Sequence, residues 1–67
     1  MFSIDLKGPK GNAFFLLGQA QRWAKELGRD SEALTADMKS GNYQHLIEVF
    51  EREFGDICNL RNKPEEF

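Results

Sequence analysis

NYQHLIEVFEREFG, residues 42–55, combines an apolar repeat with a signal at each end. Its apolar side chains recur at intervals of three and four residues, which places them on one face of an α-helix. They are Tyr43, Leu46, Ile47, Phe50 and Phe54. Asn42 is a residue type that caps helix N-termini, and Gly55 ends the pattern. The stretch therefore predicts a helix over 43–54 whose apolar face turns toward a core.

Two further helices are expected before this one. In residues 13–27 the apolar side chains again share one face, and Gly28 follows the last of them. These inward positions are Ala13, Leu16, Leu17, Ala20, Trp23, Ala24 and Leu27. Residues 30–41, DSEALTADMKSG, begin with two capping residues and end on a glycine, which predicts a shorter helix. Its expected inward side chains are Leu34 and Met38.

Short strands are expected at both ends of the chain. FSIDLK, residues 2–7, alternates apolar and polar side chains, the pattern of a half-buried strand. DICNLR, residues 56–61, is partly apolar and follows a helix stop, which favours a second strand. The predicted fold is a small α+β domain over 1–62 in the order β-α-α-α-β, with three helices against a two-stranded ribbon. Residues 63–67 read as a C-terminal tail, and the pairing direction of the strands stays open.

The chain has 67 residues, which is short for a self-contained core. A domain of this size buries about 60% of the surface of its unfolded chain, and such scaffolds usually add a disulfide, a metal or a partner chain. Cys58 and His45 are the only cysteine and the only histidine, so neither an internal disulfide nor a zinc site of the usual sulfur and imidazole ligands can form. We therefore expect a homodimer whose second copy completes the core, with no cofactor and no bound metal.

Charge and hydropathy narrow the class of partners. The net charge is −2 with 30% charged residues, which gives no basic footprint for nucleic acid. No apolar run approaches the roughly 18 residues of a membrane span, and the N-terminus lacks the pattern of a signal peptide. A single thiol fits a reducing compartment. These features predict a cytoplasmic protein that does not associate with membranes.

The loop KGPKG, residues 7–11, joins the first strand to the first helix, whose expected N-cap is Asn12. Backbone N–H groups and the helix dipole bind anions at such junctions. The Lys-Ser or Lys-Thr pair of a nucleotide-binding phosphate loop is missing, and the glycine spacing does not fit a dinucleotide fingerprint. We interpret the segment as a turn, with a weak anion contact through Lys7 and Lys10 as the alternative.

The reactive residue types are not grouped in a way that predicts catalysis. His45 is expected on the wet face of its helix, and Cys58 is expected in the core as an inert thiol. The carboxylates of residues 48–56 would need a concave pocket, which a thin core does not supply. We therefore expect a protein that is not an enzyme.

Three short helices also suggest a helix-turn-helix domain whose third helix enters the major groove of DNA. The exposed side of that helix has three acids to one base, and acids repel phosphates. The basic side chains gather instead on the first helix and its flanks, at Lys7, Lys10, Arg22, Lys25 and Arg29. Nucleic-acid binding through this basic side is the alternative function of the protein. If these side chains have no function, they form an ordinary solvated surface.

Phe14 and Phe15 do not fit a self-contained monomer. Both lie well away from the centre of the apolar face of the first helix, and Phe15 shares its side with Gln19 and Arg22, which belong in water. Either both rings fold under the strands, or they form a contact surface in which aromatic and arginine side chains act as anchors. We predict an interaction surface of Phe14, Phe15, Gln19 and Arg22 in a non-enzymatic protein–protein interaction module that self-associates.

The pattern GNAFFLLGQAQRWAKELG…SGNYQHLIEVFEREFGD resembles a group of small phage and bacterial proteins. These share a Gly-Asn-Ala-Phe helix start and a Ser-Gly-Asn/Asp-Tyr helix junction, and the likeness spans residues 4–56. The shared motifs are a turn, a cap and a junction, so the resemblance brings no catalytic or binding residues. It implies a small accessory protein that acts on a host or phage macromolecule, in the host cytoplasm if a phage encodes it.

Overall fold

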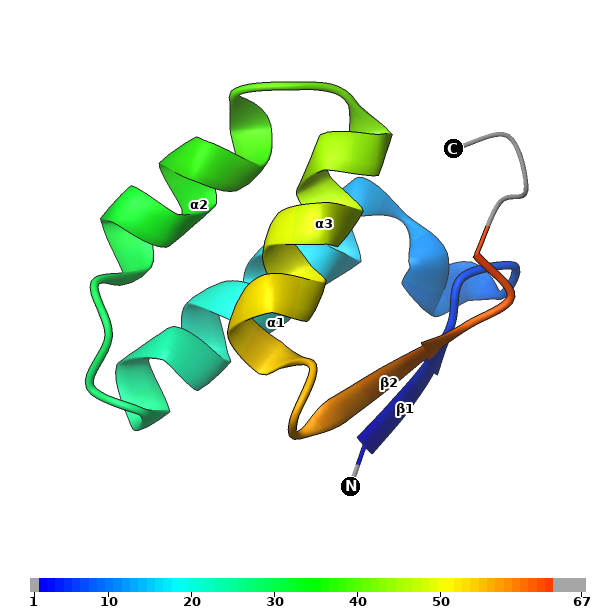
Figure 1. The fold of residues 1–67 in the computed structure, drawn as a ribbon, viewed down its shortest axis with the longest axis horizontal. Helices are drawn as coiled ribbons and strands as arrows, with labels where there is room; N and C mark the ends of the chain where they lie inside the picture. The colour runs from blue at the N-terminus through cyan, green and yellow to red at the C-terminus, as the bar shows by residue number, and fades with distance from the viewer. Residues whose placement is uncertain (1, 64–67) are drawn as a thin grey trace.

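Three helices separate the two strands of the chain in the computed structural model, which describes residues 2–63 (Figure 1). The elements are β1 Phe2–Asp5, the 3-10 turn η1 Pro9–Gly11, α1 Ala13–Glu26, α2 Ser31–Lys39, α3 Tyr43–Phe54 and β2 Cys58–Arg61. The predicted α+β fold and its order are confirmed. Of the tail predicted over 63–67, all but Lys63 lies outside the described residues, and Lys63 forms an ion pair with Glu51 of α3.

Each helix begins at a side chain that the sequence indicates as a cap. Each cap side chain accepts a hydrogen bond from the backbone N–H three residues further along. The distances are 2.8 Å for Asn12, 3.1 Å for Asp30 and 3.0 Å for Asn42. These bonds satisfy donors that the first turn of a helix otherwise leaves without a partner. After α1, Gly28 adopts a left-handed φ of 73°, which glycine tolerates without a steric penalty.

β1 and β2 form a two-stranded parallel sheet, so the direction that the sequence left open is parallel. Phe2 pairs with Cys58, and Ile4 pairs with Leu60. Parallel strands need a crossover of about a dozen residues or more, and the three helices supply it here. The sheet lies at one end of the molecule, α2 lies at the opposite end, and α1 and α3 lie between them (Figure 1).

β1 ends at Asp5, two residues before the predicted end, because the chain turns there. One oxygen of the Asp5 carboxylate accepts the Lys7 N–H and the Asn62 side-chain amide, both at 2.9 Å. These bonds hold the pKa of Asp5 below its usual value, and the bond from Asn62 has the larger effect. The turn then brings Gly11 against the backbone of Leu6, where a Cβ atom would lie 2.1 Å from the carbonyl oxygen.

The core centres on aromatic rings from α1 and α3. The ring centroids of Trp23, Phe50 and Phe54 lie 5.2 to 5.9 Å apart, and both phenylalanines are fully buried. Ile4 and Leu60 join them from the two strands. Tilted and edge-on rings at these distances add to the energy of apolar burial.

Several positions differ from the inward faces that the sequence predicts. Leu27 is 49% exposed, because it follows the last residue of α1 as its C-cap. Ala13 and Leu17 are only partly buried, although both pack against the core. Val49, which the repeat of α3 does not include, is fully buried. The core therefore covers the first turn of α1 only in part.

Candidate interaction surface around Phe14

Phe14 presents its ring to solvent in the first turn of α1, where it is 88% exposed. The Asn12 cap fixes where α1 begins, and Leu16, two residues after Phe14, is fully buried. Phe15 is half-buried and packs against the core, with the Lys10 ammonium 5.9 Å from its ring centroid. The sequence predicts the same environment for both rings, but the structure separates them. Phe15 is partly a core residue, and Phe14 is a surface residue.

The four residues of the predicted interaction surface lie together. Phe14, Phe15, Gln19 and Arg22 line one shallow hollow of about 250 Å³ on α1, with Gly18 between them. A Cβ atom on Gly18 would meet nothing within 4 Å, so packing inside the domain does not require a glycine here. Glycine in a helix interior costs roughly 0.5–1 kcal/mol relative to alanine. Its effect is to leave the backbone of α1 accessible beside the Phe14 ring.

Phe14 also borders two hollows that the sequence does not indicate. One, of about 350 Å³, lies where α1 meets the α2–α3 junction, and its apolar walls are Ala13, Leu17, Met38, Tyr43 and Leu46. The other, also of about 350 Å³, lies between α1 and α2 and includes Leu17, Gly18, Thr35 and Lys39. We call Phe14 and the residues that line these three hollows the Phe14 surface. Sequence reasoning missed the second and third hollows because they combine residues from separate helices.

The aromatic wall of the second hollow is held in place by a hydrogen bond between distant parts of the chain. The Tyr43 hydroxyl at the start of α3 donates to the carbonyl oxygen of Gly11, just before α1. Burial raises the pKa of Tyr43, so this hydroxyl keeps its proton at neutral pH. The starts of α1 and α3 are thereby joined beside Phe14.

Cations border the Phe14 surface. Arg22 lines the first hollow and Lys39 lines the other two, while no aspartate or glutamate lines any of them. Within residues 2–63 neither Arg22 nor Lys39 forms an ion pair, whereas Arg29 and Arg52 do. The protein as a whole carries a net charge of −2, so its excess of acids lies elsewhere. The Phe14 surface is thus apolar with a basic border.

The predicted anion contact at Lys7 and Lys10 lies beside this surface, at the start of α1. Asn12 already accepts the N–H of Phe15, and the backbone N–H of Lys7 is bonded to the Asp5 carboxylate. Lys10 lies over the Phe15 ring. These groups therefore have partners within the chain, and the anion contact stays a prediction.

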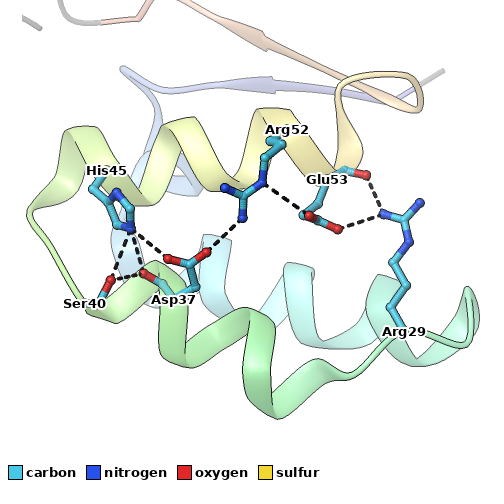
Figure 2. A network of polar contacts seen from close by, with 6 residues as sticks. All are labelled: Arg29, Asp37, Ser40, His45, Arg52 and Glu53. Atoms are coloured by element: carbon cyan, nitrogen blue, oxygen red, sulfur yellow. Dashed lines mark hydrogen bonds and ion pairs between the residues drawn. The ribbon is translucent and has the colours of Figure 1, made fainter.

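A polar network that includes His45 links α2 to α3 (Figure 2). The Asp37 carboxylate accepts from Arg52 at 2.8 Å and contacts Nε2 of His45 at 3.0 Å. The bond from Arg52, followed by the one from His45, holds the pKa of Asp37 below its usual value. Arg29 extends the network by donating to the carbonyl oxygen of Glu53 at 2.6 Å. His45, which the sequence placed on the wet face of its helix, is in fact only about one-third exposed and lies against α2.

The network does not have the geometry of a catalytic triad, although it contains a serine, a histidine and an aspartate. Nε2 of His45 lies 2.9 Å from the carbonyl oxygen of Asp37, which can only accept, so this nitrogen carries a hydrogen. Ser40 approaches the same nitrogen, at 3.2 Å. In a triad the serine and the aspartate occupy opposite nitrogens of the ring. The arrangement instead fastens the end of α2 to the start of α3.

Cys58 lies in β2 with 3% of its surface exposed, and burial raises the pKa of its thiol. A thiol of this kind stays protonated at neutral pH and is a poor nucleophile. Within residues 2–63 no three histidine, cysteine, aspartate or glutamate side chains come together in a way that could hold a metal ion. In the same part of the chain, no helix has the length and apolar character needed to cross a membrane.

Comparison of the chain with protein-family models, with curated proteins and with solved structures finds no match. The resemblance to small phage and bacterial proteins therefore stays a prediction from the residues. The geometry and charge of the Phe14 surface are the features of the molecule that bear on its function.

Proposed function

We propose that the domain is a non-enzymatic protein–protein interaction module that binds its partner through the Phe14 surface. The observation that carries this proposal is the Phe14 ring, 88% exposed on α1 and bordered by three hollows. Burying such a ring against a partner contributes on the order of 1.5–3 kcal/mol. Aromatic side chains beside pockets are frequent among the residues that dominate binding energy.

The cost of Gly18 to the stability of α1 supports the same proposal. Gly18 weakens α1, it fills no packing role within the domain, and it lines two of the hollows together with Phe14. A partner that approaches Phe14 can come close to the helix backbone at this position. Proteins often lose some stability at positions that serve function, and Gly18 fits that pattern beside Phe14.

Self-association is part of the proposal, through a different region of the molecule. Each strand of the sheet has a neighbour on one side only within the described chain, and an open strand edge can pair with a second copy. A homodimer formed in this way leaves the Phe14 surface free. We further propose an accessory role toward a host or phage macromolecule in a reducing cytoplasm, where the Cys58 thiol stays reduced.

Nucleic-acid binding is the second candidate. Lys10, Arg22 and Lys39 lie around two neighbouring phenylalanines, and single-stranded nucleic acid stacks its bases on aromatic rings flanked by cations. The affinity of such a complex falls steeply with salt concentration, because binding releases condensed counterions. An apolar protein contact depends on salt far less.

Site-specific photo-cross-linking in the cell that makes the protein tests the proposal. A photo-reactive phenylalanine analogue replaces Phe14 in one variant and Leu27 in a matched control, because Leu27 is also exposed and lies at the other end of the same helix. We expect a protein adduct at position 14 that is absent at position 27. An adduct that nuclease removes favours the second candidate, and equal yields at both positions contradict the proposal.

A further inference from the structure

We propose that the partner segment at the Phe14 surface is acidic and carries at least two large apolar side chains. This inference rests on the proposed function, because it requires the surface to be a protein-binding site. It adds the chemistry of the segment that binds there. Two independent properties of the surface, its shape and its charge, lead to it.

The shape of the surface calls for apolar side chains in the hollows that border Phe14. The two larger hollows, each of about 350 Å³, both border the ring, and they share Leu17 and Lys39 as lining residues. Their volume is at the lower end of the roughly 300–1,000 Å³ of ligand pockets, which leaves room for one large side chain in each. A segment that crosses Phe14 can place one apolar side chain into each hollow. Such a contact buries the Phe14 ring between them.

The charge of the surface calls for carboxylates beside those side chains. Arg22 lines the first hollow and Lys39 lines the two larger ones, and neither has an ion pair inside residues 2–63. Elsewhere in that part of the chain, Arg29, Arg52 and Lys63 are paired with acids. Exposed pairs at a border contribute little affinity, but they steer encounter and select against wrong partners. The apolar contact therefore supplies the affinity, and Arg22 and Lys39 select for negative charge.

A second copy of the chain is a poor occupant of the same surface. In a two-fold contact the surface meets itself, and its lining offers Arg22 and Lys39 no carboxylate as a partner. Nucleic acid satisfies the charge, but a phosphate backbone leaves the apolar wall formed by Ala13, Met38 and Leu46 without an apolar partner. An acidic protein segment with apolar side chains satisfies both.

The test is a selection of random displayed peptides on the immobilised wild-type protein, followed by measurement of dissociation constants for the enriched peptides. We expect enriched peptides to carry a net negative charge and two or more large apolar residues. Phe14→Ala should weaken their binding by about tenfold or more. The matched controls Leu27→Ala and Lys25→Glu, which change α1 outside the three hollows, should leave it unchanged.

A charge reversal makes the test specific. The double variant Arg22→Glu with Lys39→Glu, shown by thermal melting to be folded, should lose the acidic peptides and enrich basic ones when it is used as the bait. Enrichment that depends on Phe14 but shows no preference for acids overturns this inference and leaves the proposed function standing. Enrichment that is independent of Phe14, or no enrichment, contradicts both. Tighter Phe14-dependent binding of a single-stranded oligonucleotide, or loss of a homodimer in Phe14→Ala, also overturns the inference.

Discussion

Truncation of Phe50 to alanine should unfold most of the protein. The side chain is fully buried at the centre of the core, with the ring centroids of Trp23 and Phe54 at 5.9 and 5.2 Å. Removing a buried phenylalanine costs about 3–5 kcal/mol through lost apolar burial and the cavity that remains. A chain of 67 residues is stable by only about 3–10 kcal/mol, and the smallest domains lie at the low end. The loss is therefore comparable with the whole stability.

A graded variant keeps this prediction measurable. Phe50→Leu retains most of the volume but loses both ring pairs, so we expect a loss of about 1–2 kcal/mol. Urea denaturation followed by circular dichroism should then show a midpoint lower by about 1–2 M, since small domains lose about 1 kcal/mol per molar urea. Phe14→Ala is the control, and its free energy of unfolding should stay within about 0.5 kcal/mol of wild type. If Phe50→Ala denatures at the same urea concentration as Phe14→Ala, the packing described for the core is refuted.

Three further changes test particular positions by the same denaturation assay. Gly18→Ala should stabilise the protein by about 0.5–1 kcal/mol, because the site is open and helical, and a loss of stability would contradict this. Gly11→Ala should destabilise it by at least about 2 kcal/mol, since the new Cβ meets the backbone of Leu6, and a neutral result would refute that close approach. The lowered pKa of Asp37 adds stability that is present above the unfolded-state value of 3.8 and is lost as the pH falls through the lower folded value. Wild type should therefore lose more stability between pH 5 and pH 3 than Asp37→Asn, and equal losses would contradict the network.

The helices could be predicted because the interactions that set their ends and their buried faces are local. Caps at Asn12, Asp30 and Asn42 act within one turn, and the apolar repeat of α3 is visible at intervals of three and four residues. The sheet was less predictable. Two short strands at opposite ends of the chain do not reveal their pairing direction, which is decided by how the three helices pack between them.

The candidate site was predictable only in part. The helical spacing places Phe15, Gln19 and Arg22 along one side of α1, and the structure has them, together with Phe14, around one hollow. The larger hollows depend on where α2 and the α2–α3 junction pack, which no local pattern encodes. The contact of His45 with α2 was missed for the same reason, since eight residues and a helix junction separate it from Asp37.

The central claim is that Phe14 serves binding and not folding, and one paired measurement tests it most directly. A photo-reactive side chain at Gln21, which lines the hollow between α1 and α2, reports on the occupied surface without replacing Phe14. The cross-linking yield in the cell and the free energy of unfolding are measured with Phe14 intact, with Phe14→Ala and with the control Leu27→Ala. We predict that Phe14→Ala abolishes the adduct while the free energy of unfolding stays within about 0.5 kcal/mol of wild type, and that Leu27→Ala leaves the adduct unchanged. An undiminished adduct in a folded Phe14→Ala protein would contradict the account.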